Sequence, residues 1–225
     1  MKMRLTDQDR ARVAAAVAQA ERGTSGEIVT VLARRSDDYA DVALHWAVLA
    51  MLLVLALLAW QPWPIEWLHT RLIDSWAQTV PAHWYLTAAL VVTALTFLLV
   101  RVVLAKDALR IALAPGSTKT RRVHARALAL FRTAAEKRTT GSTGVLLYLS
   151  LAEHRAEILA DSAIHSRVTP EVWGGAMAAL LADVKEGRPA EGMAAAVAQI
   201  GIVLSEHFPR AADDVNELPD RLIEL

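Results

Sequence analysis

Two long apolar segments divide the chain. Residues 42–60 carry one markedly polar side chain, His45, and residues 84–105 carry one charge, Arg101. As helices with a rise of ~1.5 Å per residue, both segments would span roughly 30 Å, the thickness of a bilayer core. A chain of 225 residues is too short to bury two such helices on every side. We therefore predict a transmembrane hairpin over residues 42–105, with the lipid bilayer as its partner.

The connecting segment, residues 61–83, is predicted to lie at the membrane surface. It is rich in tryptophan, whose indole combines an apolar body with one N–H donor and suits a membrane–water interface. Ile65, Leu68, Leu72 and Trp76 recur at spacings of 3 or 4 residues, which is typical of an amphipathic helix. We interpret this helix as a lid that stabilises the hairpin rather than as a binding element.

Basic residues on the flanks of the hairpin predict its orientation. Lysine and arginine are retained on the cytoplasmic side of membranes, and the connecting segment holds only Arg71. We therefore expect two passes through a bacterial inner (plasma) membrane, with both termini in the cytoplasm. The flanking basic residues are Arg22, Arg34 and Arg35 before the first span, and Lys106, Arg110, Lys119, Arg121 and Arg122 after the second.

Residues 1–41 have the pattern of the first part of a soluble domain. Thr6 followed by Asp9 is a typical capping pair for a helix, whose apolar stripe ends near Gly23. The stretch EIVTVLA, residues 27–33, is apolar and β-branched, as expected of a strand covered on both faces. One helix and one strand cannot form a core, so their partners must lie beyond the hairpin.

The second part of the domain is predicted in residues 106–208, and residues 209–225 follow as an extended tail interrupted by Pro209 and Pro219. We expect the first two strands of the domain to be parallel, because a helix joins them, and the third to pair antiparallel with the second. This is a small α/β fold with a mixed sheet, and the hairpin is inserted into a crossover. The elements predicted after the hairpin are a helix over about 118–137, strands GVLLYLSL (144–151) and RAEILAD (155–161), a helix from Thr169-Pro170 to Gly187 and a helix over about 190–207.

Composition excludes several classes of function. The formal net charge is zero and no basic run exceeds Arg121-Arg122, so the attraction that holds nucleic-acid phosphates is missing. The chain has no cysteine, which excludes disulfides, thiolate metal sites and cysteine nucleophiles. The first 23 residues are too polar and too periodic for a secretory signal peptide, so we expect them to be part of the fold.

Three stretches carry a resemblance to a known family. They are TSGEIVTVL, TTGSTGVLLYLSLAEHRAEILAD and KEGRPAEGMAAAVAQIG. In this order they resemble the TPM domain family, whose members include a thylakoid-lumen phosphatase-like protein, and the likeness is greatest to bacterial membrane-anchored members. The resemblance covers residues 1–41 and 118–208. It implies an α/β/α sandwich, in agreement with the predicted elements.

The candidate site lies at the edge of the sheet where the first two strands begin. The opposite edge, where these strands end, leads directly into the first apolar segment, so we interpret its charges as lying at the level of the lipid headgroups. Hydroxyls and glycines at the starting edge could hold an anion through backbone N–H groups. The candidate ligand-binding residues are Ser25, Gly26, Ser142, Thr143, Asp161 and His165.

Metal-assisted chemistry is the alternative for this edge. The resemblance implies acidic residues here in members credited with phosphatase activity or metal binding, but Ser142 and Thr143 stand at one of the two positions, and Asp161-Ser162-Ala163 at the other. A lone carboxylate seldom both holds a divalent ion and orients a water. We therefore expect no cofactor, with Asp161 as the candidate ligand if Ca²⁺ or Mg²⁺ binds, and we favour a turn role for Asp161.

Two functions follow from these patterns. The first is a non-enzymatic module on the cytoplasmic face that binds an unidentified protein partner or supports the assembly or maintenance of membrane proteins. The second is a weak metal-dependent phosphatase acting on phosphate monoesters. Homo-oligomerisation through the hairpin is a third alternative.

Overall fold

The computed structural model describes residues 5–73, 79–134, 136, 141–211 and 216–225, and these form two compact units. Residues 1–37 and 116–225 make up the first unit, and residues 38–115 make up the second. In the text below, the first is called the sheet unit and the second the hairpin unit.

The sheet unit contains a four-stranded mixed sheet in the order β3-β2-β1-β4. The parallel pairing of β1 with β2 and the antiparallel pairing of β2 with β3 confirm the predicted topology. The predicted tail instead supplies a fourth strand, which pairs parallel with β1. The strands are β1 (Glu27–Ala33), β2 (Gly144–Ser150), β3 (Arg155–Ala160) and β4 (Ile223–Glu224).

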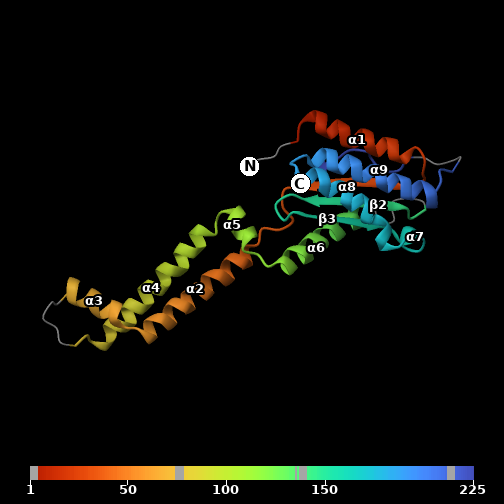
Figure 1. Ribbon diagram of the computed structural model, residues 1–225. Coiled ribbons are helices and arrows are strands. Elements are labelled where there is room, and N and C mark those ends of the chain that lie inside the picture. Colours follow the sequence, from red (N-terminus) through yellow and green to blue (C-terminus); the bar gives the residue numbers. More distant parts are fainter. Residues whose placement is uncertain (1–4, 74–78, 135, 137–140, 212–215) are drawn as a thin grey trace. The chain divides into compact units, whose positions relative to one another are not determined.

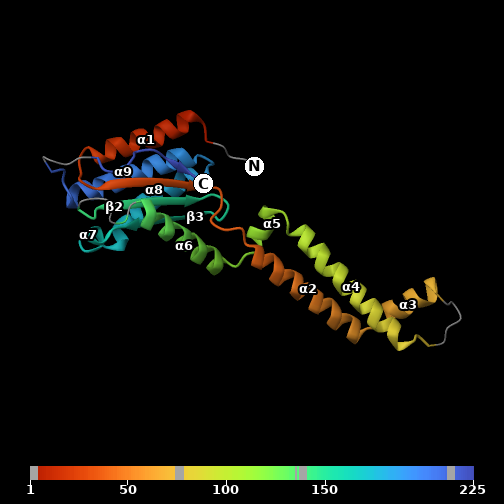
Figure 2. The same ribbon diagram turned by 180° about the vertical axis from the view of Figure 1, so that it is seen from behind.

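Helices cover both faces of this sheet, as an α/β/α sandwich requires (Figures 1 and 2). Helices α1, α8 and α9 lie over one face and α6 lies over the other. A short helix, α7, follows β3, and a 3-10 turn (Pro170–Trp173) precedes α8. The helix bounds are α1 (Asp7–Glu21), α6 (Gly116–Ala134), α7 (Ser162–His165), α8 (Gly174–Lys185) and α9 (Pro189–His207).

Alternation along β1 and β2 divides the core between the two faces. In β1, Ile28 and Leu32 pack beneath α1 and α9, while Val29 and Val31 face α6. Successive strand residues point to opposite faces, so a strand that is apolar at nearly every position needs helices on both sides. This is the physical reason that the continuous apolar runs in the sequence became central strands.

Local signals in the sequence account for most helix boundaries. Thr6 caps α1, and its main-chain N–H donates to Asp9 Oδ2 (2.8 Å), forming the predicted capping box. The helix expected over about 118–137 begins at Gly116, and the end predicted at residue 137 lies outside the described residues. Helix α7 was not predicted from the sequence, because its four residues are too few for a periodic pattern.

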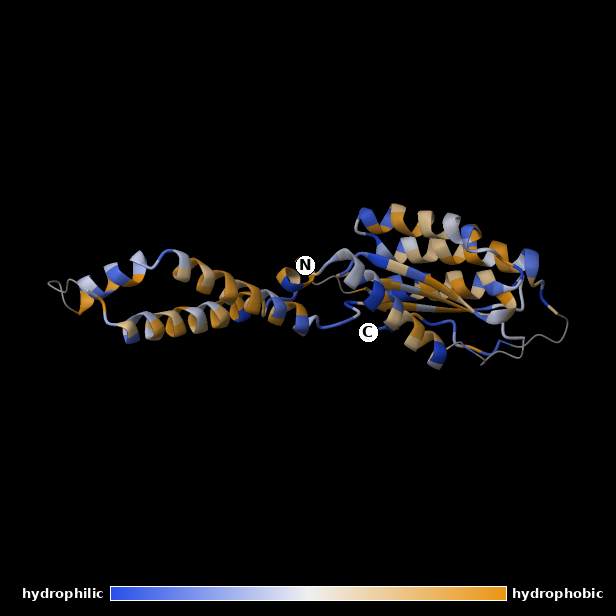
Figure 3. Ribbon diagram, turned by 90° about the horizontal axis from the view of Figure 1, so that it is seen from below, coloured by the Kyte–Doolittle hydropathy of each residue, from blue (hydrophilic) through white to orange (hydrophobic). Residues whose placement is uncertain are grey.

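The hairpin unit consists of two long helices, α2 (Ala40–Trp60) and α4 (Ala82–Val103), with two shorter ones, α3 (Trp63–Leu72) and α5 (Asp107–Ala112). Helices α2 and α4 pack side by side, and both are long and apolar enough to cross a membrane. Many residues along both helices are hydrophobic (Figure 3), and many of their large apolar side chains are exposed. Helix α5 was not predicted from the sequence.

Helix α3 lies where the lid helix was predicted, and it is attached to α4. The Tyr85 hydroxyl donates to Glu66 Oε1 (2.9 Å), and the His69 ring packs edge-on against Trp84 at 5.3 Å between centroids. Of the predicted apolar stripe, Ile65 is buried, whereas Leu68 and Leu72 are exposed, and Trp76 lies outside the described residues. The buried residues of this helix are Ile65 and His69.

Candidate functional site

The turn before β1 is bound to the end of α9. Thr24 is buried, and its hydroxyl donates to the Phe208 carbonyl (2.6 Å) and accepts from the Gly26 N–H (2.9 Å). The Ser25 N–H also donates to the Phe208 carbonyl (3.1 Å), and the Ser25 hydroxyl accepts from the Ala211 N–H (3.0 Å). The polar atoms of this turn therefore bond largely to the domain's own main chain.

Ser142 and Thr143, the candidate residues just before β2, lie next to this turn. The Thr143 hydroxyl donates to the Ser25 carbonyl (2.9 Å), and the Glu27 N–H donates to the Thr143 carbonyl (3.2 Å). Ser142 has a φ of 52°, in the left-handed region. Ser25, Gly26 and Thr143 therefore meet at one edge of the sheet, as the strand order requires. Thr139 and Thr140, which begin the stretch TTGSTG before β2, lie outside the described residues.

Asp161 is the N-cap of α7. Its side chain is buried, and Oδ1 accepts from the Ser162 N–H (2.8 Å), while its own N–H donates to the Gly144 carbonyl (2.9 Å). This is the role expected of a turn carboxylate that satisfies the first N–H groups of a helix. His165 stands at the other end of α7 and is exposed.

An acidic hollow of about 70 Å³ lies next to this edge, and the sequence reasoning missed it. Three carboxylates line it, from Glu21 at the end of α1, Glu27 at the start of β1 and Asp220 of the tail, and so do the side chains of Arg22 and Arg210. The signal was present in the stretch ERGTSGE, because a short turn between a helix and a strand brings its two flanking glutamates together. Asp220 could not be foreseen, since it is about 190 residues away in the sequence and arrives with β4.

The two glutamates of the acidic hollow have different environments. Glu27 Oε2 accepts from the Leu218 N–H (3.1 Å), and Glu27 Oε1 accepts from the Glu217 N–H (3.2 Å). Glu21 Oε1 accepts from the Ile28 N–H (2.7 Å), but burial, reinforced by the nearby Glu27 and Asp220 charges, raises the pKa of Glu21 to about 8. At neutral pH the Glu21 side chain is therefore mostly protonated.

A second polar cluster lies at the opposite edge of the sheet unit, where β1 and β2 end. Glu153 is buried, accepts from the Ser36 N–H (2.8 Å) and bonds to the Ser150 hydroxyl. The Ser36 hydroxyl also bonds to the Tyr148 hydroxyl (2.9 Å). These bonds join the ends of the two central strands, which is a structural role.

Among the described residues, no three histidine, aspartate or glutamate side chains are arranged to hold a metal ion. Thr24, Ser25 and Thr143 use their hydroxyls in main-chain hydrogen bonds, and Asp161 uses its carboxylate to cap a helix. The arrangement suits a rigid surface more than an activated nucleophile, which needs an adjacent base.

Comparison with known proteins agrees with this fold. The chain resembles the NMR structure of the BA42 protein from the psychrophilic bacterium Bizionia argentinensis, with a TM-score of 0.57 and 17% identity. The alignment covers 100% of this chain and 98% of that protein. At this identity the likeness shows the fold alone. No curated protein sequence matches the chain.

The family comparison identifies the part of the chain that follows the hairpin. The model of the TPM domain matches residues 106–203, which run from α5 to α9 and include β2, β3 and Asp161. The resemblance read from the sequence is thereby confirmed over this region. Over residues 106–203, a little under half of its length, the chain thus matches the TPM domain family.

Proposed function

We propose that this protein is a two-pass membrane protein whose TPM domain acts as a binding module for a partner protein, without an enzymatic step. The hairpin unit would hold it in the bacterial inner membrane, with both termini in the cytoplasm. The proposal rests on the hydrogen bonds of the polar side chains at the edge where β1 and β2 begin. The side chains of Thr24, Ser25, Thr143 and Asp161 all bond to main-chain groups of the same domain.

Membrane insertion and orientation are testable because the chain has no cysteine. A single cysteine at Gln61, just after α2, or at Ser117, in the first turn of α6, can be labelled with a membrane-impermeant maleimide. In spheroplasts we expect Gln61→Cys to react directly and Ser117→Cys to react only after the membrane is opened. The reverse pattern would overturn the orientation, and recovery of the protein in the soluble fraction would overturn the anchor.

The absence of catalysis is tested with the purified full chain and p-nitrophenyl phosphate. We expect no turnover above that of a buffer control, with or without Mg²⁺ or Ca²⁺. Turnover that disappears in Asp161→Asn would refute the non-enzymatic module, because asparagine preserves the cap on α7 while removing the negative charge.

A weak metal-dependent phosphatase is the second candidate, and the acidic hollow is the observation that favours it. Carboxylates are the ligands that Ca²⁺ and Mg²⁺ prefer, and Glu21, Glu27 and Asp220 line this hollow. Against it, Glu27 already accepts two N–H groups of the tail, and the raised pKa of Glu21 keeps its carboxyl group mostly protonated at neutral pH. Arg22 and Arg210 also line the hollow, and their positive charges oppose the binding of a cation. Calorimetry that detects no divalent-ion binding to the full chain would eliminate this candidate.

Homo-oligomerisation through the hairpin is compatible with either function. Helices α2 and α4 expose large apolar side chains along their length, as helices in contact with lipid or with another copy do. Cross-linking in native membranes distinguishes contact with lipid from contact with another copy, because the recovery of monomers alone would exclude an oligomer.

A further inference from the structure

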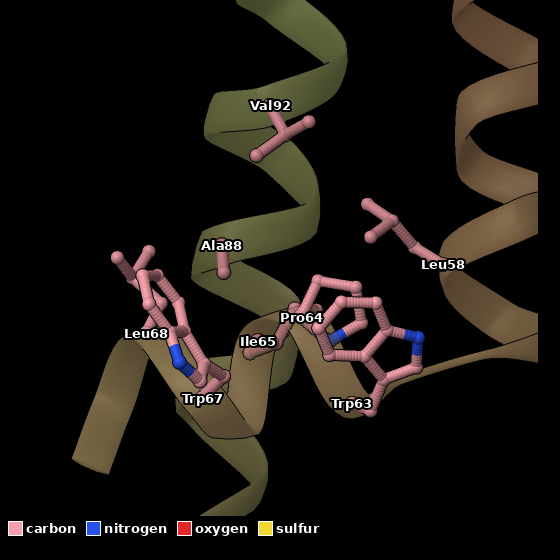
Figure 4. A pocket seen from close by; sticks show the side chains of 8 residues that line it. All are labelled: Leu58, Trp63, Pro64, Ile65, Trp67, Leu68, Ala88 and Val92. Atoms are coloured by element: carbon pink, nitrogen blue, oxygen red, sulfur yellow. The ribbon is translucent and has the colours of Figure 1, made fainter. Parts of the chain in front are cut away.

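A second hollow lies in the hairpin unit, on the inner side of α3, and has a volume of about 480 Å³ (Figure 4). Ala88 and Val92 of α4 form its back wall, Leu58 of α2 lies across from them, and Trp63 and Trp67 of α3 stand on its two sides. All these side chains are apolar apart from the indole N–H groups. The hollow therefore has the chemistry of a site for hydrocarbon.

The space arises from side-chain size. Ala88 and Val92 lie one helical turn apart on α4 and are short, whereas Trp63 and Trp67 are large and lie one turn apart on α3. The two indoles are 61% and 56% exposed, so the walls of the hollow are open to the surroundings. An apolar hollow that is left empty forfeits dispersion contacts on its inner surface, and in a bilayer the molecules that can fill it are lipid acyl chains.

A positive charge lies at the side of this hollow. The Arg71 guanidinium lies over the Trp67 ring, 5.9 Å from its centroid, and Trp67 lines the hollow. The nearby carboxylate of Glu66 accepts a hydrogen bond from the Tyr85 hydroxyl (2.9 Å). An arginine beside an apolar hollow matches a molecule that joins a phosphate to hydrocarbon, because guanidinium groups bind phosphate oxygens through paired N–H donors.

We propose that this hollow binds one acyl chain of a glycerophospholipid whose phosphate pairs with Arg71. The inference rests on the proposed insertion of the hairpin into a membrane. A bound lipid would fix α3 against α4, in addition to the Tyr85–Glu66 hydrogen bond and the His69–Trp84 ring contact. The predicted lid thus becomes one wall of a lipid site.

The test uses the full-length protein in mild detergent, stripped of lipid and then mixed with phosphatidylglycerol, with bound lipid counted by native mass spectrometry. We expect one retained phospholipid per chain for the wild type. Ala88→Phe fills the hollow and should abolish retention. Leu90→Phe is the matched control, because Leu90 lies on the same helix, is 69% exposed and does not line the hollow.

Arg71→Gln tests the headgroup contact. We expect Arg71→Gln to bind phosphatidylglycerol roughly tenfold more weakly than the wild type, because it loses a hydrogen bond between charged groups. Retention of a diacylglycerol, which has the same chains without the phosphate, should not change. Equal retention of phosphatidylglycerol by the wild type and Arg71→Gln would overturn the assignment of the phosphate to Arg71.

A readout that does not depend on Ala88→Phe guards against misfolding of that variant. Phosphatidylglycerol brominated in its acyl chains should quench the emission of Trp63 and Trp67 at one lipid per chain, and Trp63→Phe with Trp67→Phe should remove most of this quenching. No quenching at this ratio would refute the site. A dimer that excludes lipid and is broken by Ala88→Phe would show that another copy of the chain occupies the hollow instead.

Failure of this inference and failure of the anchor give different results. If alkaline extraction releases the protein from membranes, the proposed anchor is wrong and the lipid site falls with it. If the protein stays in the membrane but retains no phospholipid, the anchor stands and only the lipid site is wrong.

Discussion

The Glu27 carboxylate at the start of β1 accepts a hydrogen bond of 3.1 Å from the main-chain N–H of Leu218, 191 residues further along the chain. The same carboxylate accepts from the Glu217 N–H. These bonds hold the tail just before it forms β4, and Leu225, which follows β4, donates its N–H to the Leu32 carbonyl (3.0 Å). Glu27 thus joins the first strand to the end of the chain.

Glu27→Ala should loosen this tail. Hydrogen bonds to charged groups contribute about 1.5–3 kcal/mol, and removing a buried acceptor also leaves its donors unsatisfied. We expect a drop of this size in the free energy of unfolding, with faster hydrogen–deuterium exchange in residues 216–225. Glu224→Gln is the control on the same tail, because its pair with Arg10 is exposed and screened by solvent and should contribute little to stability. Unchanged exchange in Glu27→Ala would contradict the role of this carboxylate.

Glu21 should make the stability of the sheet unit depend on pH. Its pKa is about 8 in the folded chain against 4.5 without burial, so the folded state binds more protons than the unfolded state between these values. The free energy of unfolding should therefore fall as the pH rises from about 4.5 through about 8. Glu21→Gln should flatten this dependence, because glutamine keeps the oxygen that accepts from the Ile28 N–H and cannot ionise.

The measurement is chemical unfolding of the wild type and Glu21→Gln at pH 5, 7 and 9. Glu206→Gln, an exposed residue of α9, is the control and should retain the wild-type profile. Parallel profiles for the wild type and Glu21→Gln would show that burial does not hold the proton on this group.

Gly201→Ala should force α1 and α9 apart. A Cβ at this position would lie 2.6 Å from the Cβ of Ala20 and 3.0 Å from its Cα, which is closer than atoms pack. Overpacking of this kind typically costs about 1–3 kcal/mol. Thermal unfolding should show the loss, whereas Gly116→Ala, where a Cβ meets nothing within 4 Å, should not lower the stability. Wild-type stability in Gly201→Ala would mean that the two helices are not in close contact.

Asp161 should tolerate asparagine better than alanine. Both aspartate and asparagine can accept the Ser162 N–H as N-cap residues, while alanine cannot and typically costs about 1 kcal/mol. Unfolding in urea should therefore rank the wild type and Asp161→Asn together, above Asp161→Ala. A loss of stability in Asp161→Asn equal to that in Asp161→Ala would indicate that the charge of Asp161 has a role beyond the cap.

Part of the candidate site could be predicted from the sequence. The parallel pairing of β1 with β2 placed Ser25 and Thr143 at the same edge, since equivalent ends of parallel strands meet, and the position of Asp161 after β3 followed from antiparallel pairing. The partners of their side chains could not be predicted. They are main-chain groups such as the Phe208 carbonyl, and no pattern of residue types indicates which carbonyl a turn will meet.

The amino-acid sequence by itself determined the two apolar helices, the four longer helices of the sheet unit (α1, α6, α8 and α9) and its three long strands, because each depends on a periodicity or a cap within a few residues. Only the tertiary structure decided that the tail forms β4, that Glu21, Glu27 and Asp220 share one hollow, and that Ile65 and His69 are the buried residues of α3. These features join segments far apart in the chain or depend on the rotation of one helix against another. They are set by packing and by the satisfaction of buried polar groups, which local patterns do not specify.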